Sequence, residues 1–349
     1  MNPVEKASFA DATHQLAPAD SSRSFSDYWW VPAILAIYFA AQTAIRIAIS
    51  NSLRIDEAQQ FLVSQWLAWG YDAQPPLYNW IQYGIFEVFG TSVASLVIFK
   101  NILLFLVYFA YYRLLRLLLV DKRLAAVGAL SLLTMPQMFW QAQRDLTHTV
   151  ATLLAVIMVI HFVVVTIRRP TVASYAMIGL WAGLGMLTKY NFALVVISVL
   201  VATFFHPEGR KRLLDKRLLL TLSIAVLMFL PHAVWMVSNM DRVLTTTVHT
   251  MSAQDAGNKL SDIGVGLVEL LKTGVAIVIP TTVIFLLIFR QSFLRSLRAK
   301  SEWSDFVGRI LVSTLVILLG LILAITLTEF RDRWLLPFLF LLPLYFCLK

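Results

Sequence analysis

Residues 29–58 read WWVPAILAIYFAAQTAIRIAISNSLRIDEA, and they join an apolar run to a short polar link. The run, residues 30–49, is long enough to cross a bilayer as a helix. Its leading aromatic residues are typical of a membrane interface. The link ends in the adjacent acids Asp56 and Glu57. The sequence therefore predicts two carboxylates at a membrane edge, where folding does not require them.

The composition extends this pattern to the whole chain. Of its 349 residues, 59% are hydrophobic and 14% are charged, and the mean hydropathy is +0.74. Several further runs are long and apolar without alternation, which predicts an all-α polytopic membrane protein and argues against a β-barrel. The single cysteine, Cys347, excludes an internal disulfide and a CxxC metal site.

The apolar runs predict a bundle of about ten transmembrane helices. We expect a disordered cytoplasmic tail over residues 1–28 and one transmembrane domain over residues 29–349. The predicted spans are residues 30–49, 92–112, 124–140, 146–167, 172–187, 192–205, 218–237, 274–289, 306–328 and 334–348.

Two longer connections fall between these spans. Residues 50–91 predict an external loop with two interfacial helices, because Phe61, Leu62, Trp66 and Trp69 recur at helical spacing before a Pro-Pro break. Residues 238–272 predict a second long external loop with a short amphipathic segment near residues 263–271.

Charge sets the orientation. With the amino terminus in the cytoplasm, the loops that fall inside carry nearly twice as many Lys and Arg residues as those outside. The net charge of +9 then reflects topology and not nucleic-acid binding. We expect a multi-pass plasma membrane protein, of the bacterial inner membrane, with its unusual polar residues on the periplasmic side.

Those external residues form a chemically specific set. Asp56 or Glu57 would deprotonate a nucleophile, and Lys189 and Arg333 would neutralise a phosphate. Asp145 and His148 share one side of a helix, where they would orient a substrate or bind a divalent metal, the one cofactor that the sequence suggests. Outside the cytoplasm a group-transfer enzyme needs a donor that is already in the membrane, such as a polyprenyl-phosphate sugar.

Each of these residues also has a plainer interpretation. The two acids are suited to capping a helix, Asp145 to pairing with Arg144, and a lone histidine such as His148 to an ordinary hydrogen bond. Lys189 could snorkel to the interface. Arg46 and Lys100 lie within predicted spans, where charge is costly, and the sequence does not decide what they contact.

Five motifs in order resemble the GT-C glycosyltransferases of the protein-mannosyltransferase and aminoarabinose-transferase type. They are Ile55-Asp56-Glu57-Ala58, Gln74-Pro75-Pro76-Leu77-Tyr78, Gln143-Arg144-Asp145, Leu187-Thr188-Lys189-Tyr190 and Arg333-Trp334-Leu335-Leu336-Pro337. The resemblance implies juxtamembrane helices in the first external loop and inverting transfer from a polyprenyl-phosphate sugar. It also implies that Asp56 is the catalytic base and Asp145 the second external acid.

Gln74, Tyr190 and Arg331 join Lys189 and Arg333 as predicted substrate-binding residues, although Arg331 and Arg333 could also be ordinary loop charges. Two departures from the family pattern stand out. Aminoarabinose transferases carry a lysine where this chain has Gln74, so phosphate neutralisation would fall to other cations. Family members also often continue into an extracytoplasmic C-terminal domain, whereas this sequence ends in its tenth predicted span.

The sequence thus predicts a membrane glycosyltransferase that acts on an envelope glycan, lipopolysaccharide or secreted protein. The alternatives are a transporter or lipid flippase, or an inactive scaffold of the same fold. A transporter predicts charged residues deep within the spans and pseudo-symmetric halves, whereas the notable charges here gather at one face. The sequence does not identify the sugar or the acceptor.

Overall fold

The computed structural model describes residues 29–50, 52–71, 74–241, 243 and 259–349. This part of the chain folds into helices joined by turns and contains no strand. The predicted tail, residues 1–28, lies outside the described residues. The all-α prediction is confirmed, and the chain is a multi-pass membrane protein.

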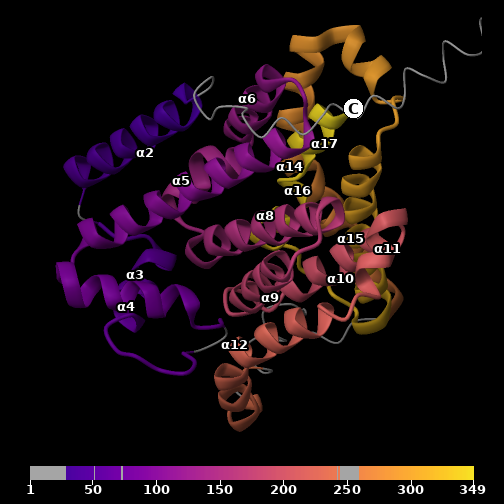
Figure 1. Ribbon diagram of the computed structural model, residues 1–349. Coiled ribbons are helices and arrows are strands. Elements are labelled where there is room, and N and C mark those ends of the chain that lie inside the picture. Colours follow the sequence, from indigo (N-terminus) through magenta and orange to yellow (C-terminus); the bar gives the residue numbers. More distant parts are fainter. Residues whose placement is uncertain (1–28, 51, 72–73, 242, 244–258) are drawn as a thin grey trace, which may run out of the picture.

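A row of five helices forms one part of the molecule (Figure 1). Each helix packs against the next in the row. At its centre, α8 is mostly buried and is apolar on all sides, as an innermost membrane helix should be. The row consists, in order, of α2 (Trp30–Ile49), α5 (Val93–Leu118), α8 (Thr147–Arg168), α9 (Val172–Met186) and α12 (Leu218–Ser238).

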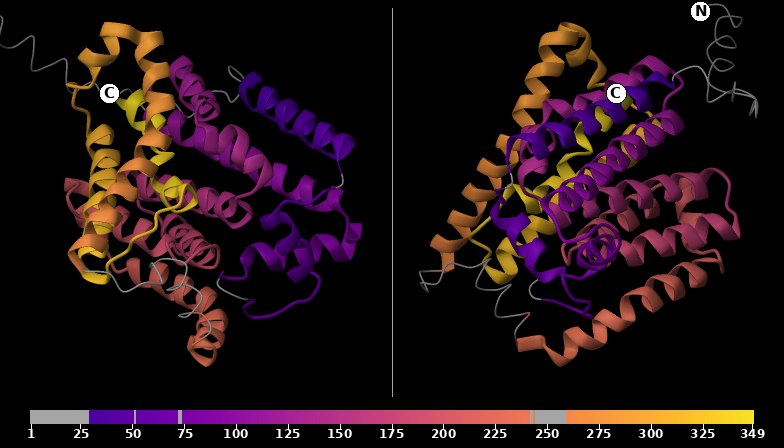
Figure 2. Two further views of the ribbon diagram at one scale, coloured as in Figure 1. Left: turned by 180° about the vertical axis from the view of Figure 1, so that it is seen from behind. Right: turned by 90° about the vertical axis from the view of Figure 1, so that its left-hand side faces the viewer.

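A second group of helices lies against this row (Figure 2). Within the group, α10 packs on α15, α14 on α16, and α15 on α17. Both α14 and α16 carry a proline inside the helix, Pro280 and Pro337. The group consists of α10 (Phe192–Phe204), α14 (Lys259–Ser296), α15 (Glu302–Ile325), α16 (Asp332–Leu339) and α17 (Leu342–Leu348).

The first loop contains the two expected short helices, α3 (Ile55–Val63) and α4 (Leu77–Phe89). The amphipathic pattern overestimates the length of α3, since Trp66 and Trp69 lie in turns beyond its end. A buried hydrogen bond from Asn79 to Gln60 (2.6 Å) ties α4 to α3. Gly90, with φ of 81°, ends α4 in a conformation that favours glycine.

The prediction of about ten continuous spans is not confirmed. Six helices of the described residues are long and apolar enough to cross a membrane, or seven if one bent pair counts as a single span. The fifth expected span, α9, has only 15 residues. The tenth is divided into α16 and α17, and Pro343, which lacks an amide hydrogen, stands in the first turn of α17.

The third expected span is also broken. It consists of α6 (Lys122–Leu130), a 3-10 turn η2 (Ser131–Thr134), a π-helical turn η3 (Gln137–Gln141) and the three-residue α7 (Ala142–Arg144). Pro136 separates the two irregular turns, where it can donate no backbone hydrogen bond. The apolar run is therefore continuous in sequence, but its backbone does not form one continuous helix.

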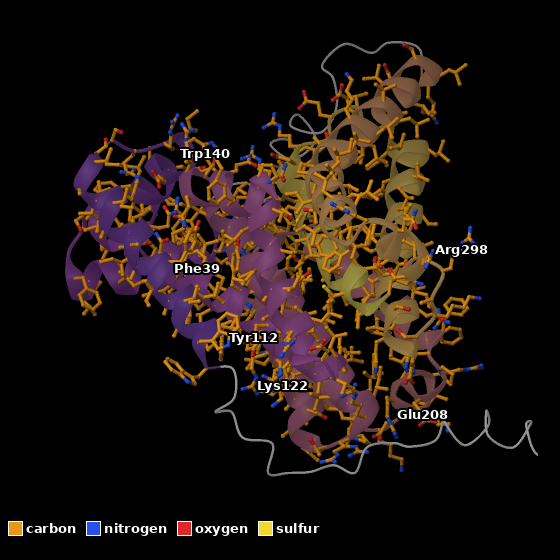
Figure 3. The ribbon with its side chains drawn as sticks, turned by 90° about the horizontal axis from the view of Figure 1, so that it is seen from above. Phe39, Tyr112, Lys122, Trp140, Glu208 and Arg298 are labelled. Atoms are coloured by element: carbon orange, nitrogen blue, oxygen red, sulfur yellow. The ribbon has the colours of Figure 1, made fainter. Side chains whose placement is uncertain are left out.

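Two other boundaries differ from expectation. Helix α14 begins at Lys259, so residues 259–272 are helical and the long loop expected over residues 238–272 is shorter. The basic helix α11 (Pro207–Leu213) bends 117° away from α10. Viewed from above, Lys122 and Glu208 lie toward one end of the molecule and Trp140 toward the other (Figure 3).

Candidate active site where α3, α8 and α16 meet

Asp56 reaches away from its own helix. Although it lies in the first turn of α3, its Oδ2 accepts a hydrogen bond from the backbone amide of Leu146 (3.3 Å). Its Oδ1 lies 3.4 Å from the Nη1 of Arg333, at the start of α16. The side chain remains 22% exposed. Asp56 therefore joins three segments far apart in sequence, and it does not cap α3.

Glu57, the next residue, performs the capping that the plainer interpretation assigned to both acids. Its Oε2 accepts from the backbone amide of Arg54 (3.2 Å). The carboxylate is fully buried and lies 2.7 Å from Lys100 Nζ and 3.1 Å from an Arg46 nitrogen. That Glu57 is a second base stays a prediction, but these surroundings favour a structural role over a catalytic one.

The turn before α8 aims its backbone at Asp56. Leu146 is buried and adopts the left-handed conformation, with φ of 65° and ψ of 29°, which is unfavourable for a branched side chain by about 1 kcal/mol or more. Beside it, burial and the nearby charge of Asp56 raise the pKa of the Asp145 carboxyl. The structure thus brings the two acids of the motif set into one electrostatic neighbourhood.

Lys189 lies behind these acids in the turn between α9 and α10. Its Nζ donates to Thr149 Oγ1 (2.9 Å) and to the backbone carbonyl of Arg333 (3.3 Å). Burial, together with the positive charge of Arg333, lowers the pKa of Lys189 to about 7. Lys189 is therefore a cation close to its titration point and in contact with the segment that carries Arg333.

The Pro-Pro motif approaches the same turn. The Leu77 amide donates to the Leu187 carbonyl (3.0 Å), which brings the start of α4 next to the residues before Lys189. Pro75 and Pro76 are buried, and Gln74 is partly exposed at the edge of this contact. The contact explains how two motifs more than a hundred residues apart meet.

Tyr190 and Arg331, both predicted to bind substrate, have other partners. The Tyr190 hydroxyl lies 3.1 Å from His232 Nε2, and the His232 Nδ1 lies 2.8 Å from the Trp69 carbonyl. Because a carbonyl only accepts, the neutral ring carries its hydrogen on Nδ1, and Tyr190 donates to Nε2. Burial raises the pKa of Tyr190 to about 12. Arg331 is exposed and pairs with Glu329 (3.2 Å). The substrate-binding roles of both residues stay predictions.

The structure gives little support to a metal at Asp145 and His148. His148 is buried at the start of α8, and its ring lies 5.4 Å from that of Tyr78. Within the described part of the chain, no group of three or more His, Cys, Asp or Glu residues lies close enough to hold one ion.

Sequence reasoning missed several members of the site. Thr149 and the Leu146 amide have no distinguishing sequence signal. His232 could have been noticed, because a histidine within an apolar span is unusual and calls for a partner. Lys100 and Arg46 carried that signal, and both turn out to be partners of Glu57.

The architecture is that of a GT-C-type bundle. It matches a crystal structure of ArnT from Cupriavidus metallidurans bound to undecaprenyl phosphate, with a TM-score of 0.65 at 15% identity, over 91% of this chain and 59% of that one. The apo structure of the same protein matches with a TM-score of 0.63. At this identity the likeness shows the fold.

Sequence comparison names relatives within this class. The family described as dolichyl-phosphate-mannose-protein mannosyltransferase matches residues 73–235. Two lipopolysaccharide core galacturonosyltransferases of Rhizobium johnstonii, RgtB and RgtA, are 40% and 41% identical over 93% and 90% of this chain. The chain spans 65% and 63% of their lengths. The predicted resemblance to GT-C glycosyltransferases is thus confirmed.

Proposed function

We propose that this chain is a membrane glycosyltransferase that moves a sugar from a polyprenyl-phosphate donor to a lipopolysaccharide core acceptor, with Asp56 as the general base. The observation that carries the proposal is the direction of the Asp56 side chain. It leaves its own helix and lies partly exposed between the α8 turn and Arg333, next to a second acid and a second cation.

The chemistry follows from this placement. Asp56 accepts the proton of an acceptor hydroxyl while the hydroxyl oxygen attacks the anomeric carbon. The bond between that carbon and the phosphate oxygen breaks, and polyprenyl phosphate leaves with the bonding electrons. The configuration inverts because attack and departure are on opposite sides. Arg333 and Lys189 balance the charge that develops on the leaving phosphate.

An apolar groove suits the lipid tail of such a donor. It has a volume of about 450 Å³ and lies between α14, α15 and α16. Its first α16 residue, Leu335, lies two positions after Arg333, and the groove continues along Phe338 and Leu339. A phosphate at Arg333 would therefore have a hydrocarbon path beside it. One matched structure contains undecaprenyl phosphate, a lipid of this class.

The names of the relatives support a galacturonate donor and a lipopolysaccharide core acceptor. We place the protein in the bacterial inner membrane with the site on the periplasmic side. The positive-inside pattern supports this orientation, because the basic loops and the cluster around Asp56 fall on opposite sides of the predicted topology.

Mass spectrometry of lipopolysaccharide core from a deletion strain tests the proposal. Complementation with the wild-type gene should restore one sugar, and its mass should be that of a hexuronate. Asp56→Asn should lower transfer by about 100-fold or more, since a general base contributes roughly that factor. Glu329→Gln is the matched control, because that exposed acid lies at the same end and pairs only with Arg331 among the described residues.

Two outcomes would contradict the proposal. Full restoration by Asp56→Asn, with the variant present at the wild-type level, would remove Asp56 as the base. No change in any envelope glycan on deletion would favour the transporter or inactive-scaffold alternative.

A further inference from the structure

A second apolar groove lies among α8, α9, α10, α11 and α12, and none of the residues clustered around Asp56 lines it. Its volume is about 330 Å³. Along α9 it extends from Tyr175 to Met186, which is roughly 16 Å at 1.5 Å per residue. That is about half of a hydrocarbon core of about 30 Å, so the groove has the length of one leaflet.

The groove faces the surrounding lipid. Its lining includes Ile197 and Leu200 of α10 and Leu222 of α12, and all three side chains are exposed. Buried residues of α8, including Val159 and Val163, form part of the same lining. A hydrocarbon chain could therefore enter sideways from the bilayer and lie between α10 and α12.

Polar atoms without partners gather at one end of this groove. Thr166 is 2% exposed, and its hydroxyl has no hydrogen-bond partner among the described residues; the same holds for the Arg212 Nε. Both residues line the groove. By contrast, the Thr203 and Thr221 hydroxyls in the lining donate to backbone carbonyls. Buried unpaired polar groups are rare, so the pair at this end points to a ligand with oxygen acceptors.

The charge at that end is positive. Residues 208–217 contain five basic and two acidic side chains. Asp215 is bound to Arg217 (2.6 Å), and Glu208 lies closer to Lys211 (2.6 Å) than to Arg212 (3.5 Å). Arg212 thus keeps donor capacity that its neighbours do not use. Basic pockets at helix ends are known to hold anionic lipid headgroups.

We propose that this groove binds an anionic glycerophospholipid of the leaflet on the basic side. One acyl chain lies along α9, the phosphate meets the Arg212 guanidinium, and the Thr166 hydroxyl donates to an oxygen near the glycerol. The site is separate from the donor groove, and its occupancy requires no sugar transfer.

Native mass spectrometry of the purified full chain would test this site. Phosphatidylglycerol and phosphatidylcholine with identical acyl chains serve as the two probes. We expect the wild type to bind phosphatidylglycerol about tenfold more tightly than phosphatidylcholine. Arg212→Ala should remove that preference. Lys211→Ala is the matched control on the same helix, since Lys211 is exposed and outside the groove lining, and it should keep the preference.

Thr166→Val provides a second test that retains the charge. It should weaken phosphatidylglycerol binding several-fold, because valine has the size of threonine but lacks the hydroxyl that would donate a hydrogen bond to the lipid. Equal retention of both lipids by the wild type would overturn the proposal, as would an equal loss in Lys211→Ala and Arg212→Ala. Displacement of phosphatidylglycerol by added undecaprenyl phosphate would instead assign the groove to polyprenyl lipid and would also overturn it.

Discussion

Asp56 and Glu57 are neighbours in sequence and opposites in environment. Consecutive residues of a helix point about 100° apart, so one acid of the pair turns toward α8 and α16 and the other toward α2 and α5. The sequence could predict that a carboxylate lies at the membrane edge. The adjacency of the two acids does not say which one faces the site, because the answer depends on Lys100 and Arg333, far along the chain. Only the resemblance to GT-C glycosyltransferases singled out Asp56.

The lowered pKa of Lys189 predicts how the rate of transfer depends on pH. Its pKa of about 7 lies below that of an ordinary lysine, so the free protein loses this positive charge as the pH rises through 7. The value of kcat/KM for the donor should therefore fall above pH 7, by at most about tenfold per pH unit. Lys189→Arg should flatten the profile, because arginine stays charged. Steady-state rates at low donor concentration between pH 6 and pH 9 provide the measurement.

The same titration has the opposite effect on stability. Above pH 7 the unfolded chain binds a proton at residue 189 that the folded chain has released, so stability contributed by this group rises with pH toward 10. The Tm of the wild type, measured at several pH values, should include this rise between about pH 7 and pH 10. The Tm of Lys189→Met should lack it. If the two slopes coincide, Lys189 is not near its titration point.

At the scale of elements, a buried charge cluster fixes α3. Glu57, Lys100 and Arg46 connect it to α5 and α2, and Arg46 also donates to the carbonyls of Ser50 and Ser52. Glu57→Gln leaves the Lys100 charge buried without its carboxylate, which costs about 3 kcal/mol or more. We expect the Tm to fall by roughly 6 °C or more, with partial loss of transfer as Asp56 shifts.

The double variant Glu57→Gln/Lys100→Met distinguishes a structural role of Glu57, which holds α3 in place, from a role as the catalytic base. It removes both buried charges and should recover most of the Tm and much of the transfer. A Glu57→Gln variant with an unchanged Tm and no transfer would instead identify Glu57 as a base.

The fold was predictable element by element, with instructive failures. Long apolar helices such as α2, α8 and α12 were placed within a residue or two, because hydropathy alone determines them in a bilayer. The breaks around Pro136 and Pro343 were missed, since a hydropathy pattern records burial and not backbone hydrogen bonding. Helix α14 was predicted too short, because its first turns include polar residues that interrupt the apolar run although they are helical.

Candidate site residues show the same limit. The structure brings Asp56, Asp145, Lys189 and Arg333 into one region, since each lies at or beside a helix end, and their catalytic and binding roles stay predictions. The Leu146 amide was not predictable as a partner, because its contribution depends on a left-handed turn. His232 stands out within an apolar span, but its contacts with Tyr190 and Trp69 depend on the fold and could not be read from the sequence.

The orientation of the whole molecule can be tested directly. In a Cys347→Ala background no native cysteine remains. Arg331→Cys lies at the end that carries the cluster, and Lys211→Cys lies on the basic helix α11; both positions are exposed. A membrane-impermeant maleimide should label position 331 in spheroplasts and position 211 only after permeabilisation. Reversed labelling would place the site in the cytoplasm.

The contact between Asp56 and Arg333 has a kinetic consequence. The two side chains are 3.4 Å apart, so a phosphate that binds the guanidinium competes with the carboxylate for it. Under the proposed function, an acceptor that arrived alone would meet a base already held by its own counter-ion. The donor phosphate would draw that counter-ion away and leave the carboxylate ready for a hydroxyl. The proposal therefore implies an order of binding, donor first and acceptor second.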